Sequence, residues 1–156
     1  MTSASERDNT GRLRRLLLAI VAIGAAGLLL ELSLLDHRDS LTQWIPYGVL
    51  ALVLIATAVV WRSPSRLTLR IFRVAMVIAF VGGALGVVLH YRGNVEFERE
   101  HDDTIHGRQL VWKALHGATP ALAPGALVQL ALVGFAFAYR HPAGRKVHND
   151  TERNDE

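Results

Sequence analysis

The residues that stand out as capable of chemistry are an acid and a histidine beside long apolar stretches. Glu31 is the one ionisable residue well inside such a stretch, and His90 closes another. A carboxylate inside a membrane is costly and usually faces a partner within the bundle. Because imidazole and carboxylate ligands suit zinc, iron, copper or manganese, we hypothesise that Glu31 and His90 bind a divalent transition metal. The alternative is a protonated or hydrogen-bonded polar tie between two helices, since the spacing matches no strong metal motif such as H-E-x-x-H.

The expected topology gathers further polar side chains on the same outer surface. They would form a pocket for a metal ion or a small polar ligand, and its residues are Glu31, His37, Gln43, His90, Asn94, Glu96 and Glu98. The chain has no glycine-rich phosphate loop, no G-x-S-x-G segment and no c-type haem attachment motif. Whether the protein is an enzyme, and which residues would be catalytic, therefore stays open.

Four apolar stretches must position these residues. They run over about 16–35, 44–61, 71–91 and 122–139, and each is near the roughly 20 residues that a helix needs to cross a bilayer. Charged residues make up 20% of the chain but fall almost entirely between the stretches. The pattern predicts an all-α fold, a bundle of four transmembrane helices over residues 13–142, with disordered cytoplasmic tails over 1–12 and 143–156. The absence of cysteine excludes disulfides and thiolate metal sites.

The basic residues indicate an orientation. Most of them flank one side of the predicted bundle, namely Arg7, Arg12, Arg14, Arg15, Arg62, Arg66, Arg70, Arg73, Arg140, Arg145, Lys146 and Arg153. By the positive-inside rule both termini are cytoplasmic, and the loops over 37–43 and 92–121 face outward. We expect a bacterial inner membrane protein. The net charge of +3 reflects this topology rather than nucleic-acid binding.

The outward loop is expected to hold one further helix. Residues 107–116 predict a short interfacial helix lying on the outer membrane surface, with an apolar side formed by Leu110, Val111, Ala114 and Leu115.

The bundle can also be read as two tandem helical hairpins. The first and third stretches share one spacing of two glycines and an ionisable residue: Gly24, Gly27 and Glu31, then Gly83, Gly86 and His90. Arg14 and Arg73 correspond as well. A true duplication would relate the hairpins by an axis along the membrane normal, with the first and third helices packed through their glycines. The alternative is that such residues are common in every membrane helix.

Several phrases of the sequence carry a family resemblance. They are Glu31-Leu32 followed by His37, Gln43 and Pro46, and the segments over 89–98, 117–125 and 139–142. On these phrases the chain resembles a family of small four-helix bacterial integral membrane proteins with no assigned activity. The resemblance implies the topology and the bacterial inner membrane, and it implies no function.

Three functional hypotheses follow. The leading one is an integral membrane protein whose outward polar pocket binds a metal ion or a small polar ligand. The alternatives are a structural or assembly subunit of a membrane complex without a ligand of its own, and a membrane redox enzyme that depends on a metal or haem. The expected partners are the lipid bilayer and either other membrane subunits or further copies of the chain.

Overall fold

The computed structural model describes residues 2–34, 43–117 and 122–144, and these residues are almost entirely helical. The helices, in chain order, are α1 (Thr2–Leu34), α2 (Trp44–Arg62), α3 (Arg66–His101), α4 (Gly107–Leu115), α5 (Leu122–Ala138) and the short 3₁₀ helix η2 (Pro142–Gly144). The predicted all-α class is confirmed.

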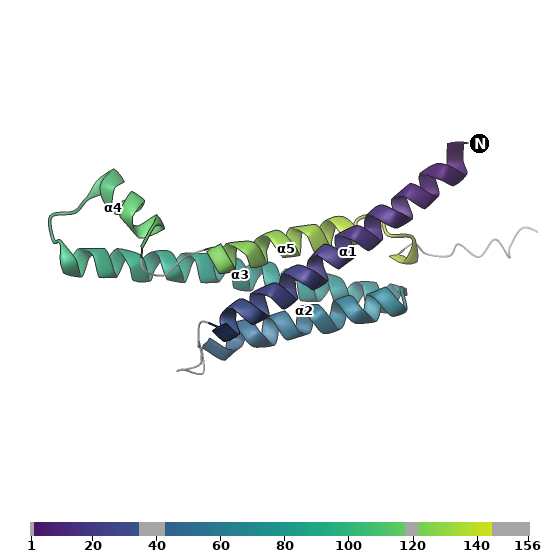
Figure 1. The fold of residues 1–156 in the computed structure, drawn as a ribbon, viewed down its shortest axis with the longest axis horizontal. Helices are drawn as coiled ribbons and strands as arrows, with labels where there is room; N and C mark the ends of the chain where they lie inside the picture. The colour runs from purple at the N-terminus through teal and green to yellow at the C-terminus, as the bar shows by residue number, and fades with distance from the viewer. Residues whose placement is uncertain (1, 35–42, 118–121, 145–156) are drawn as a thin grey trace, which may run out of the picture.

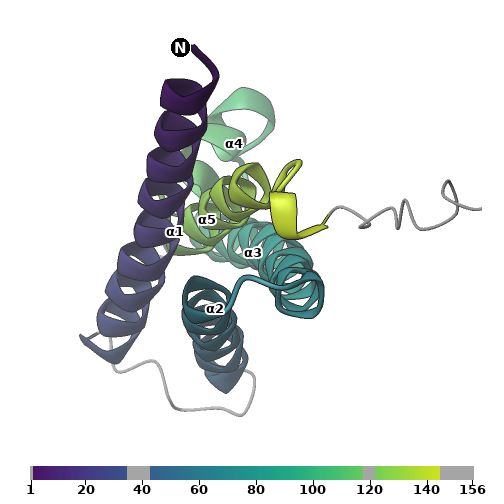
Figure 2. The same cartoon turned by 90° about the vertical axis from the view of Figure 1, so that its right-hand side faces the viewer.

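Four of these helices pack around one apolar core. In Figure 2, α5 lies between α1 and α3, and α2 completes the group. Helices α1 and α3 each pack against both α2 and α5, whereas no Cα atom of α1 lies within 8 Å of a Cα atom of α3 in the described residues. The centre of the core is formed by Val21, Val53, Phe72, Met76 and Ala131, each at most 1% exposed.

The predicted glycine contact between the first and third helices is wrong. Gly24 of α1 faces Leu130 of α5, and Gly83 of α3 faces Pro124 of α5. Gly27 has open space around its Cα. Both helices use glycine to approach α5, because a Cβ would meet the Leu130 side chain at Gly24 and backbone and side-chain atoms of α5 at Gly83. Within the described residues, α1 and α3 therefore do not pack against each other through these glycines.

Helix α3 is much longer than its apolar stretch. It has 36 residues, or about 54 Å at 1.5 Å per residue, against about 30 Å for a hydrocarbon core. It begins with a capping box between Ser65 and Thr68. Figure 1 shows its far end projecting beyond α1, α2 and α5, with α4 folded beside it. The predicted helix end at 91 and the predicted loop from 92 are thus wrong. Hydropathy shows only where the apolar stretch ends, and the charged residues that follow it continue the same helix to His101.

The N-terminal segment also differs from the prediction. Residues 2–12 were expected to form a disordered tail, but they continue α1. Asp8 forms an ion pair with Arg12 one turn later, at 2.9 Å, and the Thr10 hydroxyl donates to the carbonyl of Glu6. Adding a residue to a helix that has already formed costs little free energy. The two local contacts are therefore enough to keep the polar N-terminal residues helical. The predicted tail over 143–156 lies outside the described residues from 145 onward.

In the described part of the chain, three helices are long and apolar enough to cross a membrane, by length and composition: Asp8–Leu34 within α1, α2 and α3. The corresponding segment of α5, Pro124–Ala138, is apolar but shorter. The outer faces of the long helices carry large apolar side chains, such as Ile23, Ile55 and Val81, which are more than half exposed. An extended apolar surface of this kind marks a membrane or protein interface.

Candidate functional site

The two proposed metal ligands lie on α1 and α3, whose backbones are not adjacent in the described residues. Glu31 is exposed near the end of α1, and His90 is half-buried on α3. Gln43 is half-buried just before α2, and His37 lies outside the described residues. Within the part of the chain that the structure describes, no three His, Asp or Glu side chains are grouped to hold a metal ion. The metal site at Glu31 and His90 therefore stays a prediction, without geometric support.

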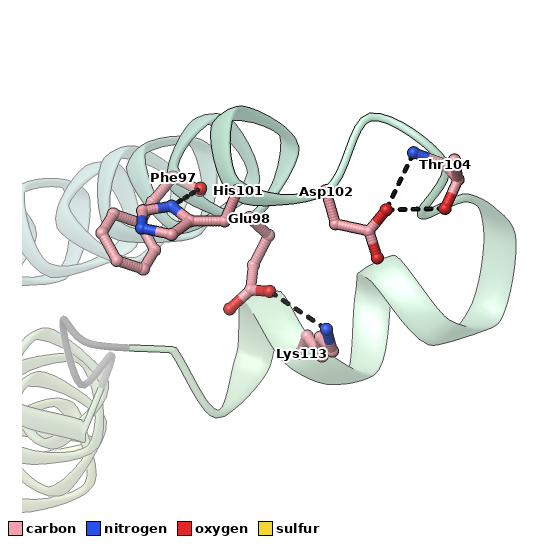
Figure 3. Close-up of polar contacts among 6 residues, drawn as sticks. All are labelled: Phe97, Glu98, His101, Asp102, Thr104 and Lys113. Atoms are coloured by element: carbon pink, nitrogen blue, oxygen red, sulfur yellow. Dashed lines mark hydrogen bonds and ion pairs between the residues drawn. The ribbon is translucent and has the colours of Figure 1, made fainter.

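The remaining predicted pocket residues belong to the projecting end of α3. Asn94 is buried, and its Nδ2 donates a hydrogen bond of 2.9 Å to the carbonyl of Ala114 on α4. Glu98 pairs with Lys113 of α4 at 3.6 Å, as Figure 3 shows. Glu96 is exposed. The structure thus brings Asn94 and Glu98 to α4, and not to Glu31.

Together these contacts define the outer hairpin, which consists of residues 92–117. A tight turn joins its two helices, and Asp102 Oδ1 accepts hydrogen bonds there from the backbone N–H and the hydroxyl of Thr104, at 3.0 and 2.6 Å (Figure 3). These bonds, the hydroxyl first, hold the pKa of Asp102 below its ordinary value. Sequence reasoning missed Thr104 and Lys113, although an acid two residues before a threonine is a recognisable turn signal.

The predicted short helix exists, but its apolar side is divided. Leu110 and Ala114 are buried, whereas Val111 and Leu115 are exposed. Since α4 packs along the projecting end of α3 (Figure 1), Leu110 and Ala114 contact protein rather than lipid. Helix α4 is therefore the second half of a helical hairpin with α3, and its location on a membrane surface stays a prediction.

At the opposite end of the bundle, two arginines bind the end of α5. Arg14 Nη2 of α1 donates to the carbonyls of Tyr139 and Arg140, at 3.4 and 3.2 Å. Arg73 Nη2 of α3 donates to the carbonyl of Ala138 at 2.8 Å. The correspondence of Arg14 with Arg73 was visible in the sequence, but their common target was not.

The outer face of α1 carries an unusual group for an apolar helix. Ile23 and Leu30 are 73% and 61% exposed there, Gly27 is exposed beside them, and Glu31 follows one turn later. Intramembrane carboxylates normally face the interior of a bundle. In this structure Glu31 is exposed, and the neighbouring Gly27 has open space at its Cβ position, where another helix could approach closely.

Comparison with known proteins adds no assignment. No protein-family model, no curated protein and no solved structure matches this chain. The resemblance to small four-helix bacterial membrane proteins stays a prediction.

Proposed function

We propose that the protein is a four-span subunit of a membrane complex and binds a partner helix through the outer face of α1. The observation that carries the proposal is the outward position of Glu31. A carboxylate at the edge of an apolar span costs free energy unless it gains a partner or reaches water. Helices α2 and α5 pack against α1, whereas Glu31 is exposed, so we expect the partner to come from another polypeptide.

The chemistry of Glu31 indicates what the partner carries. A second copy related by a twofold axis would bring two carboxylates together, which is unfavourable unless they share a proton. A helix with a basic or hydrogen-bond-donating side chain at the same depth satisfies the carboxylate directly. We therefore expect a different membrane subunit with such a residue rather than self-association.

The membrane arrangement supports this role. Helix α5 has 17 residues, which is within the range of about 17–25 for a membrane span, and it packs against both α1 and α3. We infer that it crosses the bilayer as the fourth span, in a bacterial inner membrane, with both termini cytoplasmic. The outer hairpin then projects into the outward compartment.

Site-specific photocrosslinking in intact membranes tests the proposal. A crosslinking amino acid at Ile23 should capture one discrete membrane protein with a basic or amide residue in a transmembrane helix. The matched control is Ile55, which is similarly exposed on α2 and should capture lipid only. The Glu31→Gln substitution in the Ile23 background should reduce capture about ten-fold or more, since a hydrogen bond to a charged group contributes roughly 1.5–3 kcal/mol.

Three results would contradict the proposal. Equal capture from Ile23 and Ile55 would show that the outer face of α1 contacts lipid like any other face. Capture that is unchanged by Glu31→Gln would show that the carboxylate does not recognise the partner. Capture of a second copy of the chain would replace the heteromeric assembly by a homo-oligomer.

A further inference from the structure

The outer hairpin has an apolar face that its own packing does not use. Leu110 and Ala114 of α4 are buried, whereas Val111, Trp112 and Leu115 are 44%, 66% and 56% exposed. Residues three and four apart are neighbours on a helix surface, so Leu115 adjoins both Val111 and Trp112 on one side of α4. Three adjoining exposed apolar side chains on a helix of nine residues indicate a contact surface rather than scattered exposure.

The most exposed residue of this face is held in one orientation. The ring of His116 lies against the Trp112 indole, with 4.2 Å between the ring centres. His116 Nδ1 also lies 3.0 Å from the carbonyl oxygen of Trp112, which is a hydrogen-bonding distance. A side chain that is already fixed loses less conformational entropy when it binds. Trp112 is therefore prepared to bind in its present position.

The contacts between α3 and α4 determine how far this face lies from the apolar part of α3. Val88 and Leu89 are the last exposed apolar residues before Arg92. Asn94 donates its hydrogen bond to the carbonyl of Ala114 from a position about 7.5 Å beyond Leu89, at 1.5 Å per residue. The headgroup layer extends roughly 5–7 Å beyond the hydrocarbon core on each side. The exposed face of α4 thus lies within or just above the headgroup layer when α3 spans the membrane.

The polarity of the face changes along α4 in the order that a membrane surface requires. Helix α4 runs from the tip of the hairpin back toward the bundle (Figure 1). Arg108, Trp112 and Leu115 follow one another along this direction with a spacing of four and three residues. Arginine suits the phosphates, tryptophan suits the headgroup level, and leucine suits the boundary of the acyl chains. No acid occurs in residues 104–121, so this segment places no negative charge against the phosphates.

We propose that the outer hairpin docks on the headgroup layer of the outer leaflet through Arg108, Val111, Trp112 and Leu115, the docking face. The Trp112 indole lies among the headgroups, and Leu115 faces the upper ends of the acyl chains. The inference rests on the membrane location proposed above, but not on a partner at Glu31. The docking face lies on the side of α4 that does not pack against α3, so the membrane and α3 hold α4 from different sides.

Tryptophan fluorescence of the full chain in nanodiscs tests the docking. The chain has three tryptophans, so replacing two of them with Phe leaves a single reporter. With Trp112 alone, a lipid that carries a spin label on its headgroup or high on its acyl chain should quench the emission strongly. Aqueous acrylamide should quench it weakly. The matched control is a single tryptophan introduced by Asp103→Trp, at an exposed position in the turn of the hairpin, where acrylamide should quench several-fold more strongly than at Trp112.

A protein with Trp44 alone separates two kinds of failure. Trp44 begins α2 and is 51% exposed, so shallow lipid labels should quench it whenever the bundle spans the bilayer. Quenching of Trp44 but not of Trp112 would overturn the docking and leave the membrane location intact. Absence of lipid quenching at both positions would overturn the membrane location as well. Shielding of Trp112 from both acrylamide and lipid labels would also overturn the docking, because protein would then cover the face.

Two substitutions within α4 test whether the docking face itself protects Trp112. Val111→Asp places a carboxylate on the docking face, and Gln109→Asp places the same charge at an exposed position outside it. Neither changes the buried residues Leu110 and Ala114. In the protein with Trp112 alone, Val111→Asp should raise acrylamide quenching several-fold, toward the value for Asp103→Trp, whereas Gln109→Asp should leave it unchanged. Equal quenching in the two variants would overturn the proposal.

Discussion

At the scale of single residues, Asn94 determines whether the outer hairpin closes. It is 2% exposed, and it fills the space beside Gly117, where an added Cβ would lie 2.7 Å from its Cγ. Replacing Asn94 with Leu keeps a similar volume but leaves the Ala114 carbonyl without this donor, at a cost of about 1–3 kcal/mol. We expect the amides of α4 to exchange hydrogen about ten-fold faster or more, measured by hydrogen–deuterium exchange.

A neighbouring substitution serves as the control for Asn94. Gly93 is exposed with open space around it, so Gly93→Ala should leave exchange in α4 unchanged. If Asn94→Leu also leaves it unchanged, the buried hydrogen bond does not hold α4 in place.

Asp102 gives the outer hairpin a defined response to acid. Its pKa is held below the ordinary value of 3.8 mainly by the Thr104 hydroxyl. The ionised form is thus favoured in the folded turn, which stabilises the turn above the ordinary pKa. That stabilisation is lost as the pH falls through the lowered pKa. Thr104→Val should raise the pKa toward 3.8 without reaching it, because the Thr104 N–H still donates. Titration of the carboxyl carbon by NMR measures this, and an identical titration in both proteins would exclude the hydroxyl as the cause.

At the scale of helices, the contact between α3 and α5 depends on glycine. A Cβ at Gly83 would lie 2.8 Å from the backbone oxygen of Pro124 and 2.9 Å from Val128, so the two helices would have to move apart. Gly83→Ala should destabilise the protein by about 1–3 kcal/mol, as overpacking does. Thermal unfolding in detergent measures this.

The adjacent glycine offers a matched comparison. Gly82 has open space around it, and alanine is favoured over glycine within a helix by about 1 kcal/mol. Gly82→Ala should therefore be neutral or stabilising. Equal melting temperatures for the two variants would contradict the close approach of α5 to α3.

At the scale of the whole molecule, the number of membrane crossings decides the position of both termini. The natural chain has no cysteine, so single cysteines can be labelled without background. With four crossings, a membrane-impermeant maleimide applied to spheroplasts should label Asp103→Cys, and it should label Glu6→Cys and Pro142→Cys only after lysis. All three positions are exposed in the structure. Labelling of Pro142→Cys together with Asp103→Cys would mean that α5 does not cross.

Local sequence determined the all-helical class and the approximate position of each apolar helix. Charged residues are separated from long apolar stretches along the chain, and this separation can be read without knowing any tertiary contact. The polar ends were less predictable. Residues 92–101 are charged and yet continue α3, since a helix outside lipid needs backbone hydrogen bonds and not hydrophobicity.

Only the tertiary structure decided which faces turn inward. On α1, Val21 and Ala25 are fully buried while Ile23 is 73% exposed, and all three are apolar. A helix that packs against protein on one side and lipid on the other is apolar all round. The spacing of its apolar residues therefore does not distinguish the protein-facing side from the lipid-facing side. For this reason the sequence predicted Glu31 to lie inside the bundle, opposite His90. The packing of α5 between α1 and α3 instead separates the helices that carry them, and Glu31 lies on the outer face.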